Sequence, residues 1–266
     1  MKKVTRVSQQ RRPGRYNIYL DDEFALAVDE KILIQFDLFK GTEVDDEMLE
    51  EIQMAEFEQK AYIKGLTLAT GRLIAKKQLV LKLKKAEFPN DIIYRVINRL
   101  EEAGILNDQA FAEAYVAVSS SNGKLGPRGI MRKLRSFGVD SDVIAEAMES
   151  YVDEDQDEHI VQQVNQLFAK YQGQSQFMAR QKVSQKLIQN GFDSDRFEPI
   201  IQDYLAELDS DDKADIEWAN LDREAQKAAD RYAQYTGWDF TRRFKRALFR
   251  RGFRADLINK WLEENK

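Results

Sequence analysis

Hydrophobic residues from Leu79 to the C-terminus recur at one spacing in four successive segments. Each segment has an apolar anchor residue, with a leucine five positions before it and an aspartate three positions after it. Glycine directly precedes the anchor in three segments, whereas Glu87 takes that place in the first. Because the anchors lie 51, 53 and 61 residues apart, the pattern indicates a tandem repeat of small supersecondary units. The anchors are Phe88, Val139, Phe192 and Phe253, the leucines are Leu83, Leu134, Leu187 and Leu248, and the aspartates are Asp91, Asp142, Asp195 and Asp256.

The repeated pattern predicts two helices joined by a tight turn. The leucine ends the apolar stripe of one helix, and the glycine supplies the left-handed conformation that closes a helix C-terminus. Ser141, Ser194 or Asn90 is expected to cap the next helix, with the aspartate in its first turn. A longer helix precedes each pair, at about 56–70, 107–121, 155–171 and 211–235. We therefore expect a mainly α fold, an elongated array of four tandem three-helix repeats preceded by a small strand-containing N-terminal module.

The N-terminal residues favour strands instead of helices. Val4–Gln9 and Arg15–Val28 are rich in strand formers, and Asp21-Asp22 lies where a hairpin turn is expected. A short helix is expected at Glu30–Phe36, and the acidic residues 43–58 form a link or the start of the array. We expect this module to cap the first repeat or to dock a partner, and not to be a catalytic domain. The predicted division is a module at 1–55 and repeats at 56–105, 106–153, 154–209 and 210–266.

Composition restricts the class of protein. Of the 266 residues, 43% are hydrophobic, which is enough for a core, and 33% are charged, which suits the large surface of a thin array. The sequence has no cysteine, so disulfides and thiolate metal sites are excluded and a reducing compartment is expected. It shows neither an apolar signal run nor a stretch of about 20 apolar residues that could span a membrane. We expect a cytoplasmic monomer that has no contact with membranes.

The net charge is −5, yet the basic residues gather in four clusters, each on the second or "middle" helix of its repeat. The acidic residues collect elsewhere, at 43–58, Asp153–Glu158, Glu198–Asp215, Glu263 and Glu264. If stacked middle helices line up, the clusters form a basic stripe that suits phosphates or an acidic protein surface. The alternative is four ordinary solvated faces. The candidate binding residues are Arg72, Lys76, Lys77, Lys82, Lys84 and Lys85; Lys124, Arg128, Arg132, Lys133 and Arg135; Arg180, Lys182 and Lys186; and Arg242, Arg243, Lys245, Arg246, Phe249, Arg250 and Arg251.

The last middle helix shows this segregation best. At 100° per residue, Phe240, Phe244, Ala247 and Leu248 share one face, and the basic residues occupy the opposite arc. Phe249 projects among the arginines and lysines. Its ring either stacks on a base or enters a protein pocket, or else it packs on a neighbouring repeat.

The sequence offers little to catalysis. His159 is the single histidine and lies near a helix start, where a structural role is expected. Gly123–Pro127 lacks the spacing of a phosphate-binding loop and is expected to be an interhelical loop, with Pro127 opening a helix. The acidic group Asp209–Asp212 could bind Mg²⁺, although a capping role at a helix junction explains it better. We expect no enzymatic activity, no cofactor and no metal.

Two segments resemble the RecX family, regulators of the bacterial RecA recombinase. Residues 100–112 read LEEAGILNDQAFA and are similar to that family's leucine, glycine, leucine, Asp-Asp, Phe-Ala signature, with Asn107 where the family often has aspartate. Residues 124–130 read KLGPRGI and, followed by Leu134 and Gly138-Val139, are similar to its Gly-Pro, isoleucine, leucine, Gly-Ile run. The four-repeat length resembles the longer members of the family.

The resemblance implies a negative regulator of homologous recombination, in DNA repair and the SOS response. Family members bind RecA and its filament on single-stranded DNA, lodge in the filament groove, and limit filament growth and activity. Two alternatives stay open at this point. One is a direct DNA- or RNA-binding helical-repeat protein without a recombinase partner, and the other is a metal-dependent nuclease at the acidic junctions.

Overall fold

The computed structural model describes residues 1–151, 155–207 and 210–265. The chain divides into two compact units. One comprises Met1–Ala112 with Ser136–Val143, and the other comprises Glu113–Arg135 with Ile144–Lys266. Among the described residues, every helix is too short or too polar to cross a membrane.

The N-terminal module is a four-stranded antiparallel sheet with one helix. Strands β1 (Lys2–Gln9), β2 (Arg15–Leu20), β3 (Glu23–Asp29) and β4 (Glu43–Val44) lie in the order β3-β2-β1-β4, and α1 covers Glu30–Gln35. Asp21 and Asp22 form the β2–β3 turn with φ of 48° and 69°, which confirms the predicted hairpin. The sequence analysis missed β4, which has only two residues and an acidic side chain. It pairs with Lys2 and Lys3 at the edge of the sheet.

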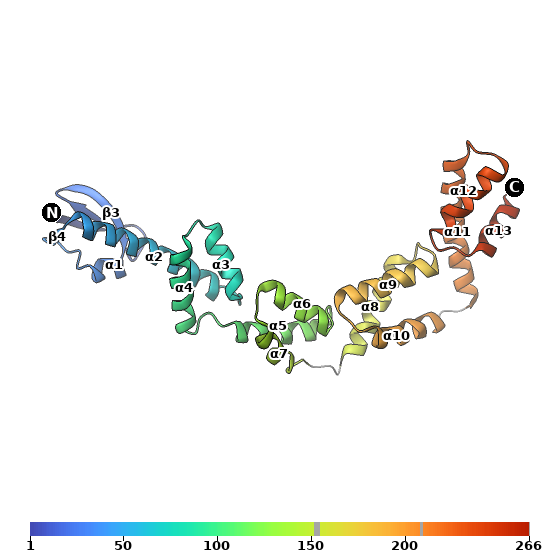
Figure 1. The fold of residues 1–266 in the computed structure, drawn as a ribbon, viewed down its shortest axis with the longest axis horizontal. Helices are drawn as coiled ribbons and strands as arrows, with labels where there is room; N and C mark the ends of the chain where they lie inside the picture. Colours follow the sequence, from blue (N-terminus) through green and yellow to red (C-terminus); the bar gives the residue numbers. More distant parts are fainter. Residues whose placement is uncertain (152–154, 208–209, 266) are drawn as a thin grey trace. The chain divides into compact units, whose positions relative to one another are not determined.

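Helix α2 (Asp46–Thr70) joins the module to the helical part of the chain (Figure 1). It begins where the Asp45 carboxylate accepts a hydrogen bond from the Met48 amide at 2.8 Å. Ile52 packs in the core of the N-terminal module, and Ala61 packs in the next core along the chain. The acidic segment 43–58 is therefore mostly helix, and the predicted start at residue 56 was ten residues too late. Most of its acids lie on the solvent-facing side of this shared helix, whereas Glu56 is buried.

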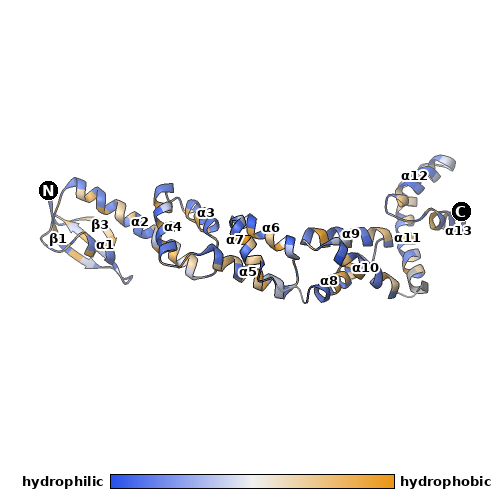
Figure 2. Cartoon of the chain, turned by 60° about the horizontal axis from the view of Figure 1, so that its bottom comes forward, coloured by the Kyte–Doolittle hydropathy of each residue, from blue (hydrophilic) through white to orange (hydrophobic). Residues whose placement is uncertain are grey.

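Eleven further helices follow in the described part of the chain, in successive groups of three that begin with α2. Their hydrophilic and hydrophobic sides are distinct in Figure 2. This arrangement confirms the mainly α fold with a small strand-containing module, while the exact repeat boundaries stay a prediction. The helices are α3 (Lys76–Lys85), α4 (Asn90–Glu102), α5 (Asp108–Asn122), α6 (Pro127–Phe137), α7 (Ser141–Met148), α8 (Gln156–Tyr171), α9 (Gln176–Asn190), α10 (Ser194–Glu207), α11 (Ser210–Tyr232), α12 (Gly237–Phe249) and α13 (Ala255–Glu264).

The repeated turn has the predicted conformation. The four repeat leucines are completely buried. The residues before the anchors, Glu87, Gly138, Gly191 and Gly252, all have a left-handed φ between 63° and 89°. A non-glycine residue accepts this conformation at a modest cost, so Glu87 keeps the turn.

The predicted helix caps were placed one residue too late. Pro89, not Asn90, is the cap residue of α4, and Asn90 is its first helical residue. Likewise α10 begins at Ser194, and the Phe197 amide donates to the Asp193 carbonyl at 3.2 Å. Helix α7 begins at Ser141 itself. The polar residues after the anchors are thus the first helical residues, each one position after the cap.

Candidate interaction surface

The predicted basic residues lie on or beside the middle helices α3, α6, α9 and α12. Most are exposed, whereas Lys82, Lys182, Arg243 and Arg251 are half-buried. Arg72 and Lys124 lie in the loops before α3 and α6, and Arg250 and Arg251 follow the end of α12.

Helix α12 presents a cationic face with an aromatic ring at each end. Trp238, Arg242, Lys245 and Phe249 lie at helical spacing on one side, opposite the buried Phe244. Trp238 is 73% exposed and Phe249 is 68% exposed, so Phe249 is not packed on a neighbouring repeat. The Arg242 guanidinium lies 4.8 Å from the centre of the Trp238 ring. Lys245 makes no ion pair with a described carboxylate.

The other two arginines of α12 differ in how many contacts their side chains make within the protein. Arg243 is held against the Tyr235 ring at 4.2 Å and against Asp239 at 3.4 Å, so it belongs partly to the body of the repeat. Arg246 is exposed and has no ion pair among the described residues. Local geometry therefore selects Arg242, Lys245 and Arg246 as the cations best placed to meet a partner.

The sequence analysis missed Trp238, because an isolated tryptophan gives no periodic signal within one helix. Comparison between repeats reveals it. Trp238 lies fifteen residues before the anchor Phe253, and Phe177 lies fifteen residues before the anchor Phe192. In the same way Phe249 and Ile188 both lie four residues before their anchors. Phe177 is 63% exposed and Ile188 is 57% exposed, so the outer faces of α9 and α12 both carry exposed apolar residues at both ends.

Charge distinguishes the outer face of α9 from that of α12. The hollow on α9 between Phe177 and Ile188 is lined by Gln181, Ser184 and Gln185 along with Arg180. Arg180 is paired with Glu198 at 3.0 Å, and the Lys182 ammonium lies 5.6 Å from the Tyr171 ring. The predicted cluster on α9 is therefore weaker than its sequence suggests.

Two arginines of the α6 cluster hold neighbouring repeats together. Arg128 pairs with Asp193 at 2.7 Å, and Arg132 donates to the backbone carbonyl of Gln189. Next to them the Gly126 amide donates to the Asn190 carbonyl at 3.0 Å. These contacts join the start of α6 to the end of α9, which gives both arginines a structural role beside the predicted one.

The glycine before each anchor also explains how successive repeats meet. A Cβ added at Gly138 would overlap the Lys77 side chain, and one at Gly191 would overlap the Gly129 backbone. At Gly252 it would come within 2.7 Å of the Ser175 hydroxyl oxygen and within 2.9 Å of Phe177. At each of the three positions the added atom would thus meet the start of the middle helix of the preceding repeat. The first copy has no preceding repeat, so Glu87 needs only the turn conformation.

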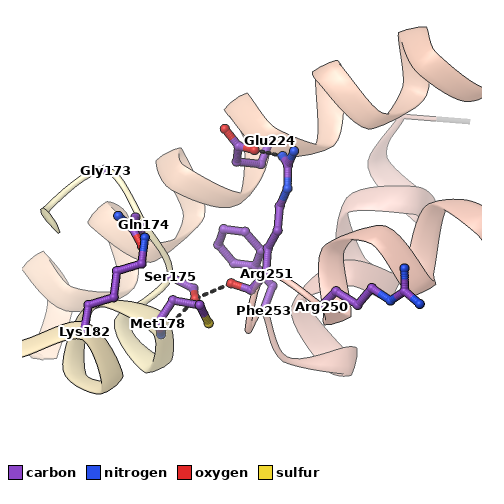
Figure 3. Close-up of a pocket in the computed structure, with 9 residues that line it drawn as sticks. All are labelled: Gly173, Gln174, Ser175, Met178, Lys182, Glu224, Arg250, Arg251 and Phe253. Atoms are coloured by element: carbon purple, nitrogen blue, oxygen red, sulfur yellow. Dashed lines mark hydrogen bonds and ion pairs between the residues drawn. The ribbon is translucent and has the colours of Figure 1, made fainter. Parts of the chain in front are cut away.

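A pocket lies where the end of α12 meets the start of α9 (Figure 3). The Ser175 hydroxyl donates to the Arg251 carbonyl at 2.6 Å, and the Arg251 side chain reaches back to Glu224. Figure 3 shows that Arg250 points away from these residues. The Arg251 charge is therefore neutralised by Glu224 of its own repeat, while Arg250 stays available to a partner.

Two carboxylates support the starts of middle helices. Asp108 accepts from the Lys76 amide at 2.7 Å, and Glu217 accepts from the Gln176 amide at 2.8 Å. Burial raises the pKa of both carboxyls above the ordinary value, while these hydrogen bonds oppose the rise. Lys76 also pairs with Glu101 at 2.7 Å. Lys76 is thus tied into its own repeat, unlike the exposed Lys84 and Lys85 at the other end of α3.

The structure also locates the residues considered for chemistry. The His159 ring packs against Gly123, where an added Cβ would overlap it, so this histidine fills space between α8 and the loop before α6. Pro127 opens α6 as predicted. No group of three or more histidine or acidic residues placed to hold a metal occurs in the described part of the chain. Asp209 lies outside the described residues, as do the side chains of 210–213.

Comparisons with known proteins identify relatives along the whole chain. Three family models match: the regulatory protein RecX N-terminal domain over residues 2–45, the RecX second three-helix domain over 107–148 and the RecX third three-helix domain over 215–262. Regulatory protein RecX of Bacillus subtilis is 34% identical over 264 residues, 99% of this chain and 98% of that protein. Its counterpart in Limosilactobacillus reuteri is 32% identical over 263 residues, with 99% and 98% covered. A crystal structure of regulatory protein RecX superposes with a TM-score of 0.64 at 33% identity, covering 76% of this chain and 100% of that one.

Proposed function

Since the chain belongs to the RecX family of regulatory proteins, we propose that it is a non-enzymatic negative regulator of homologous recombination. It acts in the cytoplasm as a monomer, and it binds the RecA recombinase and its filament on single-stranded DNA. Binding to one filament state limits filament growth and activity, and no chemical step is needed. The family relationship supports the regulatory role, and the partner follows from the resemblance stated above.

The observation that carries the proposal is the outer face of α12. Lys245 and Arg246 are exposed cations without an ion pair among the described residues, and Arg242 has only a long surface pair with Asp239 at 3.5 Å. Contact with an anionic surface would therefore break at most this one weak internal pair. Trp238 and Phe249 add exposed rings at the two ends. A surface that combines cations with rigid aromatic anchors suits a phosphate backbone or an acidic protein surface.

A fourfold charge reversal tests the proposal. Arg242, Arg243, Arg246 and Arg250 are replaced by glutamate, and inhibition of the RecA ATPase on single-stranded DNA is measured. The variant should lose inhibition, because four attractive charges become repulsive. Inhibition by the unmodified protein should weaken as salt rises, since such contacts are screened.

A matched control separates contact from overall charge. Lys170, Lys227, Arg231 and Lys260 are also exposed and lie on α8, α11 and α13, away from the middle helices. Their replacement by glutamate gives the same change in net charge and should leave inhibition near that of the unmodified protein. If the folded α12 variant inhibits as well as the unmodified protein, α12 is not the contact surface. Attention would then turn to Arg72–Lys85 and Lys124–Arg135.

A second candidate function is direct binding of single-stranded nucleic acid. The exposed rings of Trp238 and Phe249 on a cationic helix favour it, because bases stack on such rings while cations meet the backbone. Binding measured separately to a bare oligonucleotide, to RecA alone and to the assembled filament distinguishes the two functions. Equal affinity for the bare strand and the filament would support the second.

A further inference from the structure

A basic hollow lies between the N-terminal module and α2, outside all four clusters considered above. It has a volume of about 770 Å³, and its nine lining residues include Arg12 and Arg15 from the module and Lys60 and Lys64 from α2. Residues 1–20 contain six lysines and arginines and no acid. This run was not among the clusters predicted from the sequence, because strand-forming residues dominate the segment. Like the other clusters, this run contains several basic residues and is separated from the acidic residues along the chain.

A buried carboxylate fixes the walls of the hollow. Glu56 is only 4% exposed and forms ion pairs with Arg15 and, at 3.5 Å, with Lys60. Its second oxygen accepts from the Asp29 amide at 2.7 Å. One side chain of α2 thus connects two strands of the module to the helix. The hollow is a preformed feature, which reduces the ordering cost of binding a ligand.

The loop that forms one wall is also fixed. The Gln10 amide donates to the Arg15 carbonyl at 2.8 Å, and the Glu30 amide donates to the Gly14 carbonyl at 2.9 Å. Gly14 has a φ of 73°, a conformation that suits glycine. These bonds fix the backbone on both sides of the exposed Arg12, which lines the hollow together with the exposed Lys64.

The hollow has a surplus of positive charge. Glu56 offsets Arg15 and is shared with Lys60, and the Asp29 carboxylate already accepts from the Lys31 amide and from Gln59. Arg12 and Lys64 make no ion pair with a described carboxylate. The four cations of the lining therefore face two acids that are already occupied. An anion entering the hollow would meet two uncommitted cations.

We propose that this hollow binds the sugar–phosphate backbone of double-stranded DNA, as a site separate from the α12 face. Its lining has two arginines, two lysines, a threonine and a glutamine, which are donors that suit phosphate oxygens. It has no aromatic residue, whereas surfaces for single strands combine cations with rings that stack on bases. A duplex shields its bases and presents two phosphate strands, so it needs only the cations.

The experiment measures binding of the full chain to a labelled 20-base-pair duplex in the absence of recombinase. Arg12→Glu with Lys64→Glu should weaken binding at least tenfold at low salt. Arg12→Gln with Lys64→Gln should reduce the slope of log affinity against log salt by about 1.8, the value for two lost phosphate contacts at roughly 0.9 each. Thermal unfolding should be unchanged, because both side chains are exposed and unpaired with described residues.

The matched control is Lys31→Glu with Lys40→Glu. Both lysines are exposed in the same module, lie outside the hollow and give the same change in net charge. Duplex affinity of this control should stay within about threefold of the unmodified protein, since neither lysine lines the hollow and exposed surface charges are screened. Equal losses in the two pairs would overturn the proposal by showing a general charge effect.

Two further outcomes would also overturn it. One is unchanged duplex affinity in the Arg12 and Lys64 variants. The other is that these variants bind polyglutamate more weakly than the unmodified protein does but bind the duplex equally well, which would indicate a surface for an acidic protein. A single-stranded 20-mer provides the comparison of strands and should be affected less than the duplex. In the α12 fourfold variant, replacing Arg12 and Lys64 by glutamine should still reduce the slope of log duplex affinity against log salt by the same amount. The duplex-binding experiment does not measure ATPase inhibition. Failure of the duplex proposal would therefore leave the proposed function standing.

Discussion

The Phe192 amide donates to the carbonyl oxygen of Leu187 at 3.1 Å, which closes the end of α9. The same bond joins Phe88 to Leu83, and Phe253 to Leu248, both at 3.3 Å. This six-residue closure, with a left-handed residue inside it, is the Schellman motif. It explains the spacing of five between leucine and anchor. The leucine packs in the core, and the anchor returns to the same core one turn later.

Truncation of a repeat leucine should destabilise the protein strongly. Leu134→Ala and Leu187→Ala should each lower the free energy of unfolding by roughly 2–5 kcal/mol, because both side chains are completely buried. Leu81→Ala is the control, since Leu81 is exposed on α3. Denaturant unfolding gives the comparison. A loss below about 1 kcal/mol for the buried leucines would contradict their core position.

Gly191→Ala should cost more stability than Gly104→Ala, although both glycines have a left-handed φ. Each substitution incurs a backbone cost of about 1–2 kcal/mol. At Gly104 the added Cβ meets nothing within 4 Å, whereas at Gly191 it would overlap the backbone of Gly129. Overpacking should add about 1–3 kcal/mol at Gly191 alone. Equal losses in thermal or denaturant unfolding would mean that this repeat junction adjusts freely.

The two rings of α12 should contribute to binding without affecting its salt dependence. Trp238→Ala and Phe249→Ala should each weaken binding to the recombinase filament, because an exposed ring loses apolar contact and not charge. Arg246→Ala should weaken binding and also lower the salt slope. Titrations at several salt concentrations make the comparison. Unchanged affinity for both ring variants would show that the rings are not anchors.

The contribution of Glu217 to the free energy of unfolding should become less favourable as the pH rises. Burial raises the pKa of this carboxyl above its ordinary value of 4.5, so its ionised form is disfavoured in the folded protein. The resulting loss of stability is present above the raised pKa and disappears as the pH falls through that value towards 4.5. The stability difference between Glu217→Gln and the unmodified protein should therefore shift in favour of the variant with rising pH across this window. Thermal unfolding from pH 4 to 7 measures it, and a difference that is constant with pH would contradict the assignment.

The sequence by itself determined the helical repeat and its turns. Apolar spacing identified Leu83, Leu134, Leu187 and Leu248 as buried, and the glycine before three of the anchors indicated the left-handed turn. These features depend on contacts close in sequence, so periodicity and backbone preference are enough to predict them. The RecX resemblance was likewise carried by short local motifs.

Only the tertiary structure decided which charged residues are available for binding. Arg128, Arg132 and Arg251 looked like free surface cations. Arg128 and Arg132 are held at a junction between repeats, however, and the Arg251 side chain is paired with Glu224 of its own repeat. Their partners, Asp193, Gln189 and Glu224, lie 65, 57 and 27 residues away in the sequence. The basic hollow beside Glu56 also joins segments that are distant along the chain. Such pairings depend on how separate elements pack, and a pattern read along one helix carries no information about them.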